Sequence, residues 1–358
     1  MSFERSNIHS MQGYVPGEQP EAGDVIKLNT NENPYPAPAA VGAALAGIKV
    51  EDLRRYPSPT AAEFRRAVAA RHGLTADQVV PTNGGDELLR LAVTTFTAAE
   101  DKLAIAVPSY SLYPVLADIQ GCELLTVPLQ EDWQLPADFA ATLNRAGVRL
   151  AMLVNPHAPS GCLTSVAEIA RIAGEFKGVL LIDEAYVDFV DPTLEHDLLP
   201  LLKDYPNLLL LRTLSKGYSL AGLRCGYGLG CQTLIEPMLF KTRDSYNTDY
   251  ITQRLATAAI AAAAEAGKTW LQVRAARGHL KQSLEKLGFS CPDSQSNFLL
   301  ATVPEGADAS RLYHELKQRK ILVRYFDQDR LRDKLRITVG TPLQNEQLLR
   351  HLREILQL

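Results

Sequence analysis

The chain has 358 residues, of which 46% are apolar and 22% are charged, and its formal net charge is −4. This composition is typical of a folded globular protein with room for one large domain and one smaller domain. The chain has no block of like charge and no apolar run near the roughly 18 residues of a membrane helix, so neither nucleic acid nor membrane is an expected partner.

The N-terminus and the cysteines indicate a reducing compartment. Residues 1–17 have no apolar core and no small-residue cleavage site, so they are not predicted to be a signal peptide. The five cysteines are scattered, and no spacing of cysteine and histidine is typical of a metal site. We therefore expect a cytoplasmic protein without a bound metal.

The predicted elements begin with an irregular arm. Residues 1–30 are rich in proline and glycine, and we expect them to lie on a partner surface. Two helices follow at 38–48 and 61–73, the second with Gly73 as its C-cap. From there helices and apolar strands alternate. The expected helices are 84–96, 111–121 and 165–176, and the expected strands are 102–110, 122–129, 149–156, 178–186 and 207–216.

This alternation predicts an α/β fold. Short, nearly continuous apolar strands between amphipathic helices are typical of a mainly parallel sheet covered on both faces. After residue 245 a long helical tract (251–288) is expected to break near Gly267, and the remainder is expected to form a smaller α+β domain. The predicted organisation is an arm (1–30), a large domain (31–245) and a small C-terminal domain (246–358).

Reactive side chains collect after the predicted strands, where ligands of open α/β sheets bind. Lys216 and Asp183 each follow a buried apolar run, and Tyr110 follows a third. Gly84 and Gly85 begin a helix, where free N–H groups and the helix dipole favour a phosphate. An amine, a carboxylate, an aromatic ring and an anion site together suit a phosphorylated aromatic aldehyde, pyridoxal phosphate.

Each side chain has an expected role toward that cofactor. Lys216 is the predicted nucleophile for the aldehyde, and Asp183 would keep the pyridine nitrogen protonated. Tyr186 would reach the ring hydroxyl, while Thr213, Ser215 and Arg224 would join the two glycines around the phosphate. A single lysine is usually a solvated charge, and an aspartate after a strand is often only a cap. The co-occurrence and order of these residues favour the binding site.

On these motifs the chain resembles the fold-type I pyridoxal-phosphate aminotransferases, and most of all their histidinol-phosphate aminotransferase branch. The resemblance covers nearly the whole chain, and the lysine motif is its most specific part. The matching segments are KLNTNENPYPAP (27–38), RRYPSP (54–59), GGDE (84–87), DEAYVDF (183–189), TLSKGYSLAGLRCGYGLG (213–230) and LRITVGT (335–341).

The resemblance implies further cofactor contacts and an assembly. Tyr110 would stack on the ring, and Asp86 belongs to the cofactor motif GGDE. Tyr56 would reach the cofactor phosphate of a second subunit, which implies a homodimer with shared active sites.

The resemblance also implies substrate contacts. Arg336 would bind an α-carboxylate, Tyr14 and Arg324 would hold a distal phosphate, and Asn33 belongs to the N-terminal substrate motif. The alternative for Arg324 is a solvated charge on an edge strand.

One motif departs from the family. Where the family has an asparagine that bonds the ring hydroxyl, the segment NPHAPSG has Ala158. An alanine offers no hydrogen-bond donor. We therefore expect Asn155 or His157 to substitute, or Tyr186 to be the remaining partner of that hydroxyl.

These resemblances predict a transaminase acting on a small-molecule amino donor and a 2-oxo acid. The expected pair is histidinol phosphate and 2-oxoglutarate, in histidine biosynthesis. Two alternatives share the motifs: an aromatic amino acid aminotransferase and a decarboxylase of threonine phosphate. A cofactor-binding sensor fused to a DNA-binding module is disfavoured, because the sequence has neither a helix-turn-helix nor a basic patch.

Overall fold

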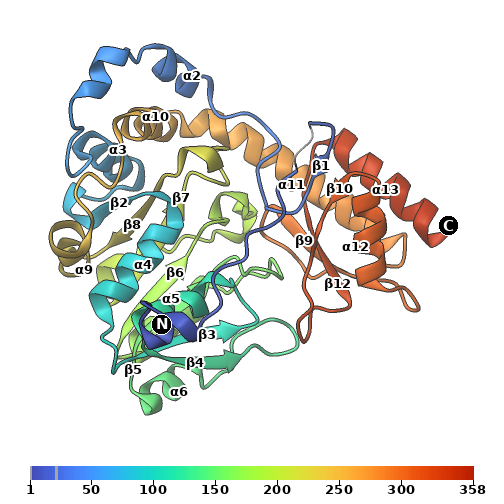
Figure 1. The fold of residues 1–358 in the computed structure, drawn as a ribbon, viewed down its shortest axis with the longest axis horizontal. Helices are drawn as coiled ribbons and strands as arrows, with labels where there is room; N and C mark the ends of the chain where they lie inside the picture. Colours follow the sequence, from blue (N-terminus) through green and yellow to red (C-terminus); the bar gives the residue numbers. More distant parts are fainter. Residues whose placement is uncertain (1, 21–22) are drawn as a thin grey trace.

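The computed structural model describes residues 2–20 and 23–358 (Figure 1). Its largest sheet has seven strands in the order β2-β8-β7-β6-β5-β3-β4. Within the described residues β8 is antiparallel to both neighbours, and the other adjacent pairs are parallel, which confirms the mainly parallel sheet. In sheet order the strands are Val79–Thr82, Gly226–Gly230, Leu208–Thr213, Val179–Asp183, Val148–Val154, Lys102–Val107 and Glu123–Pro128.

Both faces of this sheet are buried, which explains its apolar strands. Along β7, Leu208 and Leu210 belong to one hydrophobic core, and Leu209 and Leu211 belong to a second core on the opposite face. The helices of this large region are α2 (Ala39–Ala46), α3 (Ala62–His72), α4 (Gly84–Phe96), α5 (Leu112–Gln120), α6 (Phe139–Ala146), α7 (Val166–Glu175), α8 (Leu201–Asp204), α9 (Gln232–Pro237) and α10 (Tyr250–Ala261).

The glycines of β8 let other elements approach closely. A Cβ on Gly226 would lie 2.8 Å from the carbonyl carbon of Gly84, at the start of α4. A Cβ on Gly228 would lie 2.8 Å from both Leu88 and Val80 side-chain atoms. This segment therefore forms a fully buried strand that holds the N-terminus of α4 against the sheet.

A smaller α+β region follows, with a core of its own. Strands β9 (Phe298–Thr302), β11 (Arg324–Tyr325) and β12 (Lys334–Thr338) form an antiparallel sheet in the order β11-β12-β9. Its apolar face packs with α11 (Ala263–Glu285), α12 (Ala309–Gln318) and α13 (Pro342–Leu356). Figure 1 shows this region beside the large sheet, with the long α11 running toward it.

Some predicted details need correction. The long helical tract breaks at Ala262 rather than near Gly267, because α10 ends at Ala261 and α11 begins at Ala263. Ala262 has φ −96° and ψ 23°, outside helical geometry, whereas Gly267 lies inside α11, where a glycine lowers stability without ending the helix. Strand β2 and helices α6 and α12 were not predicted.

The predicted boundary at residues 245 and 246 stays a prediction. Helix α10 packs against α2 and α3, and its Leu255 and Ala256 belong to a core of the large region. The separate core of the small region takes its first α11 side chain at Leu280. The change of packing therefore falls along α11.

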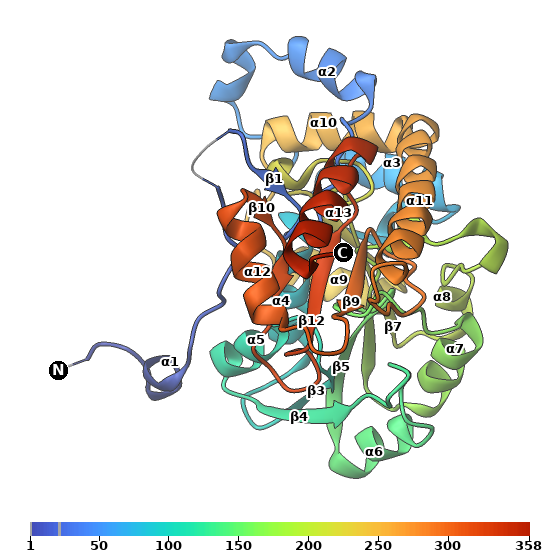
Figure 2. The ribbon, with the colours of Figure 1, turned by 90° about the vertical axis from the view of Figure 1, so that its right-hand side faces the viewer.

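The N-terminal segment crosses both regions. Helix α1 (Ser6–Ser10) lies near α5 (Figure 2). The side chains of Arg5 and Asn7 donate to the carbonyl oxygens of Ile119 and Asp118 at 3.0 and 2.7 Å. Strand β1 (Ile26–Lys27) then pairs with β10 (Ile321–Leu322) of the small region. Over residues 2–20 and 23–358, no helix combines the length and apolar character needed to cross a membrane.

Candidate active site

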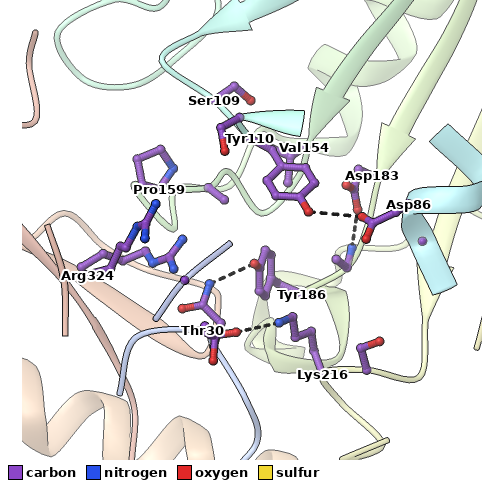
Figure 3. A pocket seen from close by; sticks show the side chains of 18 of the residues that line it. Thr30, Asp86, Ser109, Tyr110, Val154, Pro159, Asp183, Tyr186, Lys216 and Arg324 are labelled. Carbon is purple, nitrogen blue, oxygen red and sulfur yellow. Dashed lines mark hydrogen bonds between the residues drawn. The ribbon is translucent and has the colours of Figure 1, made fainter. Parts of the chain in front are cut away.

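Lys216 is one of the residues that line a cavity of about 250 Å³ between the two regions. Strand β7 ends at Thr213, whose hydroxyl oxygen accepts from the backbone N–H of Ser215 at 3.1 Å and turns the chain inward. The Nζ of Lys216 donates to the carbonyl oxygen of Thr30 at 2.9 Å (Figure 3). Burial lowers the pKa of Lys216 to about 8, and the charge of Arg336 acts in the same direction. About a tenth of this amine is therefore neutral at pH 7, a far larger fraction than for an unperturbed lysine.

Asp183 ends the neighbouring strand β6 and faces the same cavity. Its carboxylate accepts from the hydroxyl of Tyr113 at 3.1 Å and from the backbone N–H of Ala185 at 3.0 Å. Burial raises its pKa to about 7. A buried carboxylate that has these two neutral donors as its partners within residues 2–20 and 23–358 is suited to a cationic N–H partner in the cavity.

An anion cradle forms where α4 begins. Gly84 has φ +77°, and a Cβ there would lie 2.5 Å from Nη2 of Arg224, so glycine is required for the arginine to approach. Arg224 is itself left-handed at φ 54°, and its Nη2 lies 3.5 Å from Asp86. Gly85 lines the cavity at the first turn of α4, where amide N–H groups lack helical partners. Thr213 and Ser215 also line the cavity.

Aromatic side chains line the walls. Tyr110 donates its hydroxyl to Asp86 at 3.2 Å, and its ring meets Tyr14 edge-on with centroids 5.9 Å apart. The hydroxyl of Tyr186 accepts from Nδ2 of Asn31 at 3.0 Å. Figure 3 shows Tyr186 pointing into the cavity between Lys216 and the labelled Tyr110.

Two arginines form the side of the cavity that belongs to the small region. Arg324 on β11 and Arg336 on β12 are directly opposite each other in the antiparallel pair, so their side chains share one face. Arg336 donates to the carbonyl oxygen of Asn29 at 2.8 Å, yet its buried Nε has no hydrogen-bond partner among the described residues. Both guanidiniums lie over the ring of Phe326, at 5.1 and 5.5 Å.

No carboxylate of the described residues pairs with either of these arginines. Burial lowers the pKa of Arg336, and the charge of Arg324 acts in the same direction. Two neighbouring cations without an acidic partner are unfavourable in isolation, so this face is built to receive anionic groups.

Five predicted residues are not among those that line the cavity, and one of them, Gly84, lies directly before Gly85 and against Arg224. Both nitrogens of His157 are engaged, with Ser160 Oγ at 2.7 Å and the carbonyl oxygen of Pro108 at 3.0 Å. The side chain of Asn155 donates to the carbonyl oxygen of Thr164 and accepts from the backbone N–H of the same residue. The side chains of both residues are thus engaged elsewhere, Ala158 lines the cavity, and the predicted substitution for the missing asparagine stays a prediction.

Asn33 and Tyr56 are also not among the residues that line the cavity. Asn33 donates to the carbonyl oxygen of Gly217 and to the hydroxyl of Thr269, so it supports the lysine segment from behind. Tyr56 is 81% exposed and stacks on Tyr246 with centroids 4.5 Å apart. An exposed tyrosine is available to a second subunit, and that role stays a prediction.

Sequence reasoning missed three contributors. Thr30 and Asn31 lie in the recognised segment KLNTNENPYPAP, and Asn31 rather than Asn33 reaches into the cavity. The only signal in the sequence was their place in that segment, since the left-handed φ of 58° at Asn31, a conformation that asparagine tolerates, is seen only in the structure. Tyr113, the partner of Asp183, has no such signal, since it reads as an ordinary apolar position of helix α5.

The residues present fit pyridoxal phosphate. Lys216 offers an amine of lowered pKa, and Asp183 offers a buried carboxylate for the pyridine nitrogen. The start of α4 with Arg224 offers a phosphate cradle, and Tyr186 faces the cavity as a donor to the ring hydroxyl. The cofactor would thus be held at four separate points of the large region.

Comparisons with known proteins agree with this geometry. The family model described as "Aminotransferase class I and II" matches residues 23–352. Histidinol-phosphate aminotransferase 1 of Trichormus variabilis is 45% identical over 357 residues, which cover 99% of each chain. Histidinol-phosphate aminotransferase of Rhodopirellula baltica is 41% identical over 338 residues, covering 94% of this chain and 91% of that protein.

Solved structures share the fold. Histidinol-phosphate aminotransferase from Sinorhizobium meliloti, crystallised with pyridoxal-5′-phosphate, has a TM-score of 0.89 at 24% identity and covers 100% of this chain and 98% of its own. L-threonine-O-3-phosphate decarboxylase from Porphyromonas gingivalis has a TM-score of 0.80 at 20% identity, over 93% of this chain and 100% of its own. These likenesses confirm the predicted fold type and do not select the reaction. On the family match, the full-length relatives and the geometry of Lys216, the chain belongs to the class I and II aminotransferases, enzymes whose cofactor is pyridoxal phosphate.

Proposed function

We propose that this aminotransferase transfers an amino group between histidinol phosphate and 2-oxoglutarate, in histidine biosynthesis. The observation that carries the proposal is the pair Arg324 and Arg336, opposite each other on β11 and β12 and without an acidic partner among the described residues. Relatives of this name that are 45% identical over their full length support the same assignment.

The two substrates place the same demand on this cationic face. Histidinol phosphate has no carboxylate, and its phosphate carries about −1.5 to −2 charges at neutral pH. 2-Oxoglutarate has two carboxylates. Because both substrates of a transaminase use one cavity in turn, a pair of guanidiniums can hold the phosphate in one half-reaction and the carboxylates in the other. Tyr14, at the mouth of the cavity, adds a hydroxyl to this face.

Different residues of the chain have different roles in the proposed reaction. Pyridoxal phosphate, when bound, supplies an aldehyde that reacts with amines and a ring that accepts electrons. Lys216, with its pKa lowered to about 8, removes the proton from the α-carbon of the amino donor as a general base. Asp183 holds a proton on the ring nitrogen, and Tyr186 with Asn31 orients the ring hydroxyl.

The assembly and location belong to the same proposal. Exposed Tyr56 and its stacking partner Tyr246 are proposed to face a second copy of the chain, with Tyr56 reaching the neighbour's cofactor phosphate. The cytoplasm is the proposed location, since all five cysteines are free thiols in the structure.

A panel of amino donors tests the proposal. The purified holoenzyme is assayed with 2-oxoglutarate and, in turn, histidinol phosphate, phenylalanine and glutamate analogues, and glutamate formation is followed. The proposal requires histidinol phosphate to have the highest kcat/KM. An outright preference for phenylalanine would replace it with the aromatic alternative.

The decarboxylase alternative has support in the site, since threonine phosphate carries both a carboxylate and a phosphate for the two arginines. The same holoenzyme is therefore incubated with threonine phosphate, and carbon dioxide is measured. Release of carbon dioxide in preference to glutamate formation would favour the decarboxylase.

A further inference from the structure

The loop between β11 and β12 (residues 326–333, the β11–β12 loop) forms the outer wall of the cavity. Phe326, Gln328 and Leu331 of this loop line the cavity, and Leu331 is 1% exposed. Strand β11 is only two residues long and pairs with β12 at Arg324 and Tyr325. A pairing of two residues provides few hydrogen bonds to hold β11 in place. The position of Arg324 therefore depends on the contacts of the adjoining loop.

The side chain of Arg330 ties the β11–β12 loop to the large region, next to Leu331, which is buried in a core of that region. Arg330 donates from Nη1 to the carbonyl oxygen of Leu129 at 2.7 Å and from Nη2 to that of Gln130 at 2.8 Å. Its guanidinium carbon lies 4.5 Å from the ring centroid of Trp133. Arg330 has φ +67°, a left-handed conformation that is unfavourable for arginine and persists here with these three contacts.

The surface that Arg330 contacts is connected to the cavity through Trp133 and His157. Trp133 is 8% exposed and lies against the ring of His157, with centroids 6.0 Å apart and planes inclined by 30°. His157 is fixed by Ser160 and Pro108, and the next residue, Ala158, faces the cavity. The departure in the segment NPHAPSG therefore places a buried, neutral imidazole behind Trp133, where Arg330 docks.

A second arginine of the β11–β12 loop provides a contrast. Arg332 pairs at 2.7 Å with Asp327 and with Asp329, which belong to the same loop, and its side chain is 61% exposed. Arg332 therefore connects residues within the loop and does not connect the loop to the large region. Surface pairs of this kind contribute little.

We propose that Arg330 is a positioning residue for substrate: it holds the β11–β12 loop, and through it Arg324 and Phe326, against the Leu129–Trp133 segment so that the cationic face closes over a bound anion. The inference rests on the proposed assignment of Arg324 and Arg336 to the substrate anions. It adds a contact between the two regions that takes no part in bond making.

The test compares Arg330→Ala with the matched control Arg332→Ala, both as holoenzyme. Without the Arg330 contacts the loop samples open positions, so the KM for 2-oxoglutarate should rise about 10-fold, or about 1.4 kcal/mol, with kcat nearly unchanged. Arg330→Lys retains the charge over Trp133 and one donor, and its KM should fall between wild type and Arg330→Ala. Arg332→Ala should behave as wild type.

Hydrogen exchange of the ligand-free chain gives a readout that needs no amino donor. The backbone amides of Leu331 and Lys334, bonded at 3.0 Å to the carbonyl oxygens of Gln328 and Leu331, should exchange faster in Arg330→Ala and Arg330→Lys than in Arg332→Ala. Faster exchange with the expected KM supports the inference even if the wild type does not prefer histidinol phosphate.

Two results would overturn the inference. One is an unchanged KM and unchanged exchange in either Arg330 variant, with or without a lower Tm. The other is an equal change in Arg332→Ala. If Arg330→Ala does not fold, Arg330→Lys against Arg332→Ala decides the question by the same two measurements.

Discussion

The cavity has two sides that are built differently. On the cofactor side, at the ends of β6 and β7 and the start of α4, polar groups are bonded to other groups of the chain: Asp183 to Tyr113 and Ala185, and Lys216 to Thr30. On the substrate side, on β11 and β12, Arg324 and Arg336 lie together without an acidic partner among the described residues, and the Nε of Arg336 is unbonded.

The difference indicates what each side must do. A cofactor that stays bound needs binding groups in fixed positions. Its side of the cavity therefore lies at the ends of buried strands of the large sheet, where close packing allows little movement. The substrate side must accept two anions in turn and release both. The substrate side therefore lies on a short strand and a loop. Its two arginines are available to a bound anion, and contacts such as that of Arg330 set the position of the loop.

The largest expected effect is on the cofactor side. Lys216→Ala removes the amine to which we assign both the bond to the cofactor and the general base, so turnover should fall by more than ~10⁴-fold. In the wild type, borohydride reduction should fix the cofactor to the peptide that contains Lys216, as mass spectrometry would show. A label on Lys241 instead would refute the assignment.

The next effect concerns the electron-accepting ring. Asp183→Ala should lower kcat by about 10³-fold and weaken cofactor binding, since a buried charge that acts on the reacting group is lost. Stopped-flow measurement of α-proton removal checks this. Near-normal turnover would mean that Asp183 only caps the end of β6.

A third prediction asks whether the cofactor side is complete within one chain. If Tyr56 serves the neighbouring site, mixed Lys216→Ala and Tyr56→Phe chains should regain activity, because random pairing gives about a quarter of sites with both residues intact. Tyr56→Phe alone must first be shown to be impaired. A monomer in sedimentation would exclude the shared site.

The smallest effect concerns stability of the cofactor-free chain. Because burial raises the pKa of Asp183 to about 7, its folded form holds a proton that the unfolded chain releases near pH 4, so its ionisation lowers stability progressively as pH rises from 4 to 7. Asp183→Asn should therefore raise Tm at pH 8 by about 2–4 °C relative to its effect at pH 4. A Tm difference that is the same at both values would show that this carboxyl does not titrate as the structure indicates.

The sequence predicted the two sides unequally. Lys216, Asp183 and Arg224 stand out because local rules place them, after apolar strands or beside glycines, and the structure brings all three to one cavity. The roles of Asn31, Tyr113 and Arg330 were not predictable in this way. Their partners lie 155, 70 and 201 residues away along the chain, so only the folded packing brings them together.

Local sequence rules also did not predict the contacts of His157 or the helix break at Ala262. His157 was a candidate ligand of the cofactor because of its place in a motif, but the polar groups of Ser160 and Pro108 lie within reach of both its nitrogens. At Ala262 the helix ends although alanine favours helices, because packing of α10 on α2 and α3 sets its direction.

The central claim is that the substrate side recognises a phosphate, and Arg324 tests it most directly. Charge-assisted hydrogen bonds contribute roughly 1.5–3 kcal/mol, so Arg324→Ala should lower kcat/KM for histidinol phosphate by about 10- to 150-fold. The same variant should lose much less with phenylalanine, which has no phosphate. Initial rates of wild type and Arg324→Ala on both donors, with 2-oxoglutarate fixed, give the comparison. Equal losses on the two donors would contradict the claim and would assign Arg324 to the fold or to the carboxylate of the 2-oxo acid.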